Sequence, residues 1–559
     1  MRSKAHVLFV LGVVASALLG CGSGDPARKS GAKGLMPPEQ QLRAALDAHD
    51  RRPDAAARER LLEALAHPTP RRILGSPAEP IRSVECQGAW ILAIADDHVL
   101  PFDARTGMRR GRLEPEGARS IQVARLSPRG DRFVMADADG AIFGYRTATN
   151  ADRTPSPLFE RPELGARDVQ FDRSGSTIFV HGDELLALLD TGRGRSIWEL
   201  PARPGVLDAH FVEGTAGLIL VRSDRPEILD VRDGATIGFL PEKDGYRIAQ
   251  PLSGARLLLA ETEEDPGAPF LFDAVKLAPV ALPISPAESV ARAHVSGRRA
   301  WIVTGNDEII RVDADGSEAD RFAPGFTPAR LEATPDGRRL AAISADGEIA
   351  VFDTGTPEPI VRTRLDIGSP REIVWHPERT RFLVVTDDSQ VHVLDIRGKL
   401  LTTLHEHDGA VETARWSFVG RWLLTVSERG VVRLYDGDPS TAEDAYRAHA
   451  KPGDGGQPGD LGADGSISRP LPGTGLTATG DSEGRIRLVD PATDEVLFTH
   501  AAHPAAIRDL VLVETPDGID LVSTAEDGSF RVTPADPAGR ARRLLDQLQT
   551  TGSLPESPE

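Results

Sequence analysis

One motif in this sequence has the spacing of a catalytic nucleophile. Residues 480–484 read Gly-Asp-Ser-Glu-Gly and match the G-x-S-x-G pattern that surrounds the reactive serine of many hydrolases. In those enzymes the serine lies on a sharp turn that follows a strand and begins a helix. Residues 485–489 instead alternate polar and apolar side chains, as a strand does. We therefore predict that Ser482 lies in a hairpin turn and is not a nucleophile.

Two other stretches carry side chains of the kind that bind metal ions. His405, His407 and Asp408 form an H-x-H-D pattern, in which alternate side chains of an extended segment can converge on one ion. Residues 313–317 resemble the start of a calcium loop but lack its third acid and its closing glutamate. We interpret 313–317 as a turn, and we assign no metal ligand, no cofactor site and no catalytic residue in this chain.

The chain has two cysteines, Cys21 and Cys86. Cys86 stands just before the apolar run 91–94, and no cluster of basic residues adjoins it in the sequence. A reactive thiol needs a cationic, exposed setting, because the thiolate is the nucleophile. We expect Cys86 to be buried as a small apolar residue, with a reactive thiol as the alternative.

A repeating element must position these candidates, and it is clearest in residues 407–436. Residues 411–416, 422–426 and 431–435 have the character of short strands, and residues 417–420 and 428–430 form turns between them. One such repeat cannot bury both faces of its sheet. Similar repeats recur at a period of about 40 to 45 residues, which is the spacing of four-stranded propeller blades. The predicted fold class is therefore all-β.

The repeats resemble those of the WD-repeat family. A family repeat closes its third strand with Trp-Asp, and here an apolar residue followed by aspartate takes that place, as at Asp436 and Asp490. The resemblance implies a structural role for these aspartates. The same pair recurs at Phe102-Asp103, Leu189-Asp190, Leu229-Asp230, Phe272-Asp273, Val312-Asp313, Phe352-Asp353 and Leu394-Asp395.

The family also implies a structural histidine in each repeat. Its opening Gly-His is represented here by the histidine alone, at His407, His449 and His503. In the family this histidine is linked to a Ser or Thr, an Asp and a Trp of the same blade. The last repeat supplies three members in His503, Ser523 and Asp527, with Val532 in place of the Trp. No repeat has all four, so the copies are degenerate, and quinoprotein-like or other bacterial propellers remain alternative relatives.

We count about eleven repeats between residues 80 and 536. Because propeller rings close with about four to eight blades, we predict two rings, with repeats 1–5 in residues 80–285 and repeats 6–11 in residues 286–536. The proline-rich stretch 282–286 marks the division. Residues 451–475 are a Gly/Pro-rich insertion, which we expect to be an exposed loop without helix or strand.

Short helices are expected at both ends of the repeats. Residues 36–79 form a short helical segment with helices at 38–48 and 53–66, each beginning near a proline. Residues 537–559 form a C-terminal helix and a tail. The apolar stripes of the N-terminal helices are narrow, which favours packing on the protein's own body over binding a partner.

The N-terminus resembles a bacterial lipoprotein signal peptide. Basic residues at 2 and 4 precede an apolar run from 7 to 19, which ends at Leu-Gly-Cys21. The resemblance implies removal of residues 1–20 and lipidation of Cys21, with residues 21–35 as a flexible tether. It also implies a lipid anchor in the cell envelope, at the outer membrane facing the periplasm or the cell surface. An ordinary signal peptide is the alternative.

Composition restricts the function classes. The chain has 559 residues and a formal net charge of −19, which disfavours nucleic acid and a bare anionic lipid surface as partners. No catalytic constellation is apparent. We therefore expect a non-catalytic scaffold whose propeller rim binds protein partners. The alternative is a propeller enzyme or ligand sensor, either similar to the quinone-dependent dehydrogenases or metal-binding.

Overall fold

The computed structural model shows a chain that forms two compact units. The first unit contains the described residues within Ser76–Lys399 and Val411–Arg421, and the second contains those within Ala32–Gly75, Leu400–Ala410 and Trp422–Glu559. Cys21, His405, His407, Asp408 and His449 lie outside the described residues. The described residues are 38–66, 70, 72–74, 80–147, 154–212, 217–222, 225–242, 246–251, 257–262, 270–280, 290–296, 299–313, 317–404, 410–437, 460–461, 467–471, 474–515, 518–527 and 529–550.

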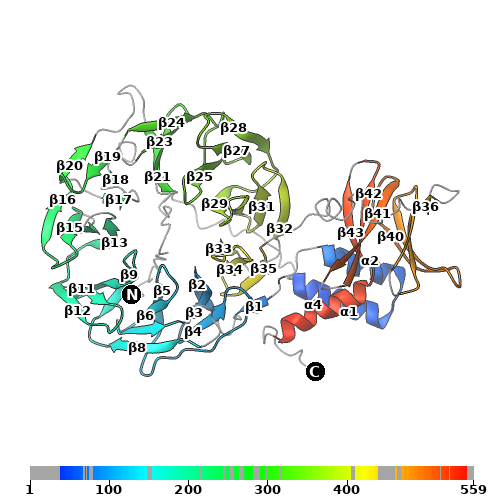
Figure 1. Cartoon of the computed structure of the whole chain (residues 1–559), viewed down its shortest axis with the longest axis horizontal. Helices are drawn as coiled ribbons and strands as arrows, with labels where there is room; N and C mark the ends of the chain where they lie inside the picture. Colours follow the sequence, from blue (N-terminus) through cyan, green and yellow to red (C-terminus); the bar gives the residue numbers. More distant parts are fainter. Residues whose placement is uncertain are drawn as a thin grey trace, which may run out of the picture. The chain divides into compact units, whose positions relative to one another are not determined.

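The first unit is built from consecutive antiparallel sheets. The described residues of the whole chain form eleven sheets, and strands β2 to β31 lie in eight of them. These follow one another around a common centre, with the first strand of each sheet innermost and the last outermost (Figure 1). The fold is thus an all-β propeller, as predicted, with one sheet for each expected repeat.

The strands of the first unit have the following bounds. They are β2 (Ile81–Gln87), β3 (Trp90–Ala95), β4 (Val99–Asp103), β5 (Ile121–Leu126), β6 (Arg132–Asp137), β7 (Ile142–Arg146), β8 (Ser156–Arg161), β9 (Ala166–Phe171), β10 (Thr177–Gly182), β11 (Leu185–Asp190), β12 (Ser196–Pro201), β13 (Val206–Val212), β14 (Gly217–Arg222), β15 (Glu227–Asp230), β16 (Thr236–Phe239), β17 (Tyr246–Pro251), β18 (Leu257–Thr262), β19 (Phe270–Asp273), β20 (Ala278–Val280), β21 (Val290–Ser296), β22 (Arg299–Thr304), β23 (Ile309–Val312), β24 (Glu318–Phe322), β25 (Arg330–Ala333), β26 (Arg339–Ile343), β27 (Glu348–Asp353), β28 (Pro359–Arg364), β29 (Pro370–Trp375), β30 (Arg381–Thr386), β31 (Val391–Asp395) and β33 (Val411–Trp416).

Burial follows each strand's place in its sheet. The second strand is covered on both faces by neighbouring sheets, so β3 is buried along its whole length and reads as a continuous apolar run. The fourth strand is covered on one face only, and β28 alternates half-buried and exposed residues. This difference explains why the second and third strands of a repeat are the easiest to recognise in the sequence.

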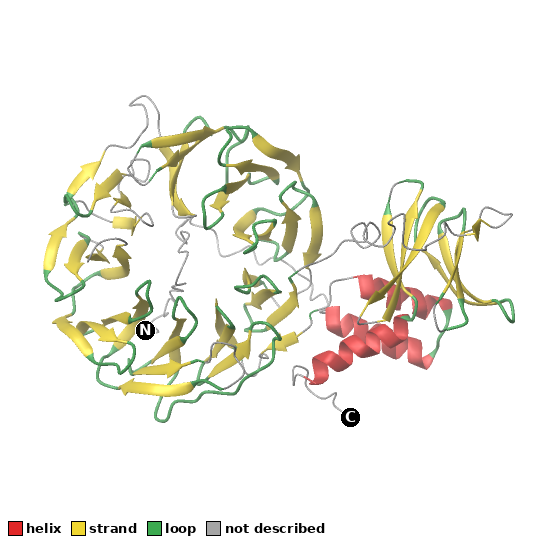
Figure 2. Ribbon diagram, viewed as in Figure 1, coloured by secondary structure: helices red, strands yellow, loops and turns green. Residues whose placement is uncertain are grey.

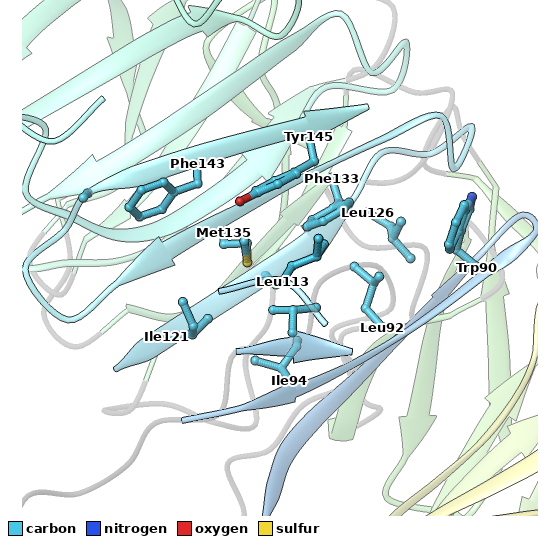
Figure 3. Packing of buried hydrophobic residues seen from close by; sticks show 13 residues of the cluster. Trp90, Leu92, Ile94, Leu113, Ile121, Leu126, Phe133, Met135, Phe143 and Tyr145 are labelled. Atoms are coloured by element: carbon cyan, nitrogen blue, oxygen red, sulfur yellow. The ribbon is translucent and has the colours of Figure 1, made fainter. Parts of the chain in front are cut away.

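Neighbouring sheets share their cores. Trp90, Leu92 and Ile94 of β3 pack in one cluster with Phe133 and Met135 of β6 and with residues of β7 (Figure 3). The rings of Phe133 and Tyr145 stack with their centroids 4.9 Å apart. Each blade therefore depends on the next for burial of its apolar face.

The expected division of the repeats at residues 285/286 is wrong. Leu271 of β19 and Val280 of β20 belong to the same core cluster as Val290, Ile302 and other residues of β21 to β23. A shared core joins the sheets on the two sides of the proline-rich stretch, because prolines in a connection interrupt hydrogen bonding but do not prevent sheets from packing. The first unit continues as far as Lys399.

In the described residues, the second unit has sheets and helices and no second ring. Three sheets of this unit, containing β34–β35, β36–β40 and β41–β43, are too few to close a propeller of four or more blades. The helices are α1 (Pro38–Arg51), α2 (Ala55–Ala66) and α4 (Pro537–Thr550), and the strands are β1 (Arg72–Leu74), β32 (Leu400–Leu404), β34 (Trp422–Ser427), β35 (Val432–Asp436), β36 (Asp460–Leu461), β37 (Ile467–Pro470), β38 (Thr477–Gly480), β39 (Arg485–Asp490), β40 (Glu495–Ala501), β41 (Ile507–Thr515), β42 (Gly518–Ala525) and β43 (Phe530–Pro534).

The three helices pack on one another and on this unit's own strands (Figure 2). Leu42, Leu61 and Leu548, one from each helix, lie in a single buried cluster that also contains Ile73 of β1. A buried ion pair fixes the start of α1, where Arg433 Nη2 of β35 donates to Glu39 Oε1 at 3.0 Å. None of the helices in the described part of the chain is long and apolar enough to cross a membrane.

The insertion at 451–475 contains strands, contrary to expectation. β36 pairs with β37, and β37 pairs with β38 over Ile467 to Pro470. Ile467 and Leu471 are buried in the core of this sheet. The segment 467–471, Ile-Ser-Arg-Pro-Leu, contains no glycine and has apolar residues that can enter a core, so high Gly/Pro content over 25 residues concealed a short strand.

Candidate protein-interaction face

The G-x-S-x-G motif forms a hairpin turn, as the alternation predicted. Ser482 lies between β38 and β39, and no helix follows it. Asp481 organises the turn, since its Oδ1 accepts the backbone N–H groups of Glu483 at 3.0 Å and Arg485 at 2.9 Å. Its Oδ2 accepts from the side chains of Arg485 and Arg487. The strand–helix geometry of a hydrolase serine is absent from these residues.

His503 is the centre of a hydrogen-bonded network in the second unit. The side chain is buried, with Nε2 2.8 Å from Ser523 Oγ and Nδ1 2.7 Å from Ser529 Oγ. Ser529 Oγ in turn donates to Asp527 at 2.6 Å. Burial and the nearby Arg531 lower the pKa of His503, so the imidazole is neutral at pH 7 and bridges two hydroxyl groups.

The structure thus brings His503, Ser523 and Asp527 together, with Ser529 as a link that the sequence interpretation missed. Ser529 follows Asp527 by two residues, and this Asp-x-Ser spacing was the available signal. Val532, in the family's Trp position, is 43% exposed and lies outside the network. The backbone N–H groups of Ala502 and His503 both donate to Gly484 O at 3.0 Å, which fixes the histidine over the turn.

The aspartate that closes a third strand caps the following turn. In seven repeats its carboxylate accepts the backbone N–H two residues further on, at 2.8 to 3.1 Å. This geometry stabilises a tight turn without support from tertiary contacts. The seven aspartates are Asp103, Asp190, Asp230, Asp273, Asp353, Asp395 and Asp490, and Asp436 lies exposed at the end of β35.

Charged side chains on innermost strands form a series of ion pairs that we call the inner belt. Its members are Glu85 of β2, Arg125 of β5, Asp168 of β9, Asp208 and His210 of β13, Glu372 of β29 and Arg415 of β33. Arg125 lies 2.9 Å from Glu85 and 3.5 Å from Asp168. His210 lies 3.2 Å from Asp208, and Arg415 lies 2.5 Å from Glu372.

Burial is the largest cause of the pKa shifts of Glu85 and Asp168 in the inner belt. It raises the pKa of Glu85 to about 7 and that of Asp168 to about 6, although Arg125 opposes both shifts. It also raises the pKa of the half-buried Cys86 thiol to about 12, with the Glu85 charge adding to the effect. Cys86 is therefore a protonated thiol at neutral pH, but it is half-buried where full burial was expected.

One group of described residues resembles a metal site, and its carboxylates already have partners in the protein. Asp97, His98 and Glu114 bring three possible ligand atoms within 4.8 Å of one another. The guanidinium of Arg112 lies 3.6 Å from Asp97 and also contacts Glu114. Because both carboxylates already pair with Arg112, and Asp97 also contacts His98 Nδ1 at 2.6 Å, we assign no metal there.

The turns after the first and third strands of a blade lie together on one face of the propeller. Antiparallel strands place these two turns at the same end of each sheet. Buried threonines connect them, since the hydroxyls of Thr147, Thr191 and Thr354 donate to Gly130 O, Gly175 O and Gly337 O at 2.5, 2.8 and 2.6 Å. The turns are therefore held rigidly as a surface.

Exposed arginines dominate this surface, which we call the arginine face. Among the described residues of the first unit, its turns carry thirteen exposed bases and five exposed acids. The bases are Arg105, Arg129, Arg146, Arg173, Arg193, Arg195, Arg232, Lys276, Arg338, Arg379, Arg397, Lys399 and Arg421, and the acids are Asp190, Asp233, Asp353, Glu358 and Glu378.

The turns between second and third strands lie at the opposite end of the sheets and have the opposite sign. Their exposed charged residues in the described part of the first unit are all acidic. The net charge of −19 does not show this distribution, because the structure separates the exposed bases and acids of the turns onto two faces. The acidic residues are Asp96, Asp97, Asp139, Asp183, Glu184, Asp346, Asp387 and Asp388.

A groove crosses the arginine face at three neighbouring sheets, β21–β24, β25–β28 and β29–β31. It consists of two cavities, of 660 and 250 Å³, which share Asp336, Arg338 and Asp353. Arg338 is 81% exposed, and Asp336 lies 2.7 Å from Arg379 and 3.7 Å from Arg338. The remaining lining residues are Arg299, Arg311, Asp320, Gly337, Arg339, Thr354, Gly355, Glu378 and Arg379.

Fold and surface together define a β-propeller whose rigid turns carry segregated charge. Residues 398–436 match the family described as "WD domain, G-beta repeat". The histone-binding protein MSI1 of Saccharomyces cerevisiae is 25% identical over 191 residues, which are 32% of this chain and 41% of that protein. The U3 small nucleolar RNA-associated protein 18 homolog of Drosophila melanogaster is 29% identical over 109 residues, which are 19% of this chain and 21% of that protein.

The chain therefore spans less than half the length of each of these relatives. Among solved structures, the C-terminal WD40 domain of Sif2 is similar, with a TM-score of 0.43 and 10% identity, over 66% of this chain and 98% of that one.

Proposed function

We propose that this protein is a non-catalytic scaffold that binds protein partners through the turns of its propeller. The observation that carries the proposal is the arginine face, where turns fixed by buried threonine hydroxyls surround a groove of 660 Å³. A rigid frame that presents many loops suits recognition of a protein surface. The name of the relative MSI1, a histone-binding protein, also supports a protein partner.

We further propose that Cys21 carries a lipid anchor and that residues 21–35 tether the body to the cell envelope, at the outer membrane. The support is the sequence pattern alone: two basic residues, an apolar run and Leu-Gly-Cys. Several acyl chains hold a protein far more firmly than one chain does. Cys21→Ser should move the protein from the membrane fraction to the soluble fraction; persistence in the membrane fraction would contradict the anchor.

The scaffold is favoured over an enzyme because each chemical candidate in the described residues has a structural explanation. Ser482 lies in a hairpin, the Cys86 thiol is protonated, and Arg112 pairs with the carboxylates beside His98. With a net charge of −19, we propose that nucleic acid is not the partner.

A pull-down from detergent-solubilised envelope tests the scaffold. The lipidated full-length protein should retain a protein partner in stoichiometric amount, and the Cys21→Ser protein added to the same extract should retain it too, because the binding surface is unchanged. Recovery of no partner, together with a bound quinone or metal ion detected by mass spectrometry, would overturn the scaffold in favour of an enzyme or a ligand sensor.

A further inference from the structure

We propose that the groove on the arginine face binds an acidic segment of a protein partner in extended form. This inference rests on the proposed scaffold function and specifies the chemistry of its partner. Arg338 lines both cavities of the groove with 81% of its side chain exposed, and Arg379 is 44% exposed at the smaller cavity. Exposed guanidinium groups pair readily with carboxylates, in which two N–H groups can meet two oxygens.

The carboxylates of the groove explain why the ligand is a peptide and not a polyanion. Asp336 and Asp353 line both cavities, and Asp336 pairs with Arg338 and Arg379. A nucleic acid or an anionic bilayer presents unbroken negative charge and would be repelled by these acids. A peptide offers backbone N–H groups to them and places its own carboxylates only at intervals, so both signs in the groove can be satisfied.

The separation of exposed bases and acids onto two faces also favours an acidic ligand at this groove. An acidic ligand approaching a protein of net charge −19 is repelled by the molecule as a whole. The arginine face is the one described surface of the first unit where exposed bases outnumber exposed acids in the turns, and the acidic turns lie at the opposite end of the sheets. The field therefore directs an acidic segment toward the groove.

Binding of a defined probe tests this inference. A fluorescein-labelled dodecapeptide of alternating Glu and Ser should raise its anisotropy when the full-length protein is added, and the affinity should fall as salt is increased. Arg338→Glu should weaken binding about tenfold or more, because it replaces attraction by repulsion at the centre of the groove. The matched control is Arg119→Glu, since Arg119 is 74% exposed and lies beside Asp139 at the acidic end of the sheets.

A second variant distinguishes lost contacts from lost folding. Asp336→Asn removes the charge that competes for Arg338 and Arg379 and should tighten binding severalfold, an effect that misfolding cannot produce. Equal affinities of the Arg338→Glu and Arg119→Glu proteins would overturn the inference. So would displacement of the peptide by a single-stranded oligonucleotide or by phosphatidylglycerol vesicles.

The scaffold function and the binding of an acidic segment can be refuted independently of each other. If the envelope pull-down recovers a partner that Arg338→Glu still retains in full, the acidic-segment inference is refuted while the scaffold stands. If it recovers no partner although the peptide binds with the expected variant pattern, the groove chemistry stands and the scaffold function loses its support.

Discussion

The inner belt should make the stability of the first unit decrease as pH rises through the neutral range. Glu85 and Asp168 both face Arg125, and burial raises their pKa values to about 7 and about 6. One guanidinium cannot compensate the desolvation of two carboxylates. Glu85→Gln removes one of them and replaces it by a neutral side chain of the same size, similar to the protonated acid.

The direction of this pH dependence follows from the number of protons that the folded and unfolded states bind. Between its ordinary pKa of 4.5 and its folded pKa of about 7, Glu85 is protonated in the folded protein and ionised in the unfolded chain. Unfolding then releases a proton, so the free energy of unfolding falls as pH rises across this window. The stabilising contribution is complete below about pH 4.5 and is lost by about pH 7. Its size is at most about 3 kcal/mol for Glu85.

Asp168 loses its contribution in the same direction between 3.8 and about 6. Because both acids share Arg125, their titrations are coupled and the two effects do not add fully. We therefore expect Glu85→Gln to reduce the pH-dependent loss of stability between pH 5 and pH 8 without removing it. Removing Glu85 leaves Arg125 to Asp168 alone, so the remaining loss should also shift to lower pH.

Thermal unfolding of the full-length protein at closely spaced pH values measures this effect. The unfolding temperature of the wild type should fall by several degrees more than that of Glu85→Gln between pH 5 and pH 8, since about 1 kcal/mol corresponds to a shift of a few degrees in proteins of this size class. Glu116→Gln, at an exposed position before β5, is the control and should follow the wild type. Parallel curves for the wild type and Glu85→Gln would refute the burial argument.

Two further predictions concern the His503 network. Gly484→Ala should lower the free energy of unfolding by about 1 kcal/mol or more beyond the effect of Gly475→Ala in chemical denaturation. Both glycines have φ near +75°. A Cβ at Gly484 would lie 2.1 Å from His503 O, whereas a Cβ at Gly475 meets nothing within 4 Å. Equal losses would contradict the close approach. Ser523→Ala should cost about 1 to 3 kcal/mol in the same assay, because it removes the hydroxyl 2.8 Å from buried His503 Nε2; a neutral result would mean that this hydrogen bond does not stabilise the fold.

Much of the local structure was readable from the sequence because it depends on residues close together in the chain. The repeat at 407–436 predicted strands at 411–416 and 422–426, and the structure has β33 at Val411–Trp416 and β34 at Trp422–Ser427. The aspartates that close third strands recur because each caps its own turn within two residues. His503 and Ser523 were paired through the family resemblance, whereas Ser529, which links His503 to Asp527, has no counterpart among the four residues that the family connects.

Period and local pattern in the sequence determined the all-β fold, the number of repeats and the turn at Ser482, since each depends on hydrogen bonding and burial over a few residues. Only the tertiary structure decided which segments share a core: Leu271 packs with Val290 across the proline-rich stretch, and α1 and α2 pack with α4 from the other end of the chain. The distribution of charge over the surface was also decided only by the tertiary structure. A sum over the sequence gives −19, but the alternating direction of antiparallel strands carries successive turns to opposite ends of each sheet. This places Arg338 and most of the exposed bases of the turns on one face.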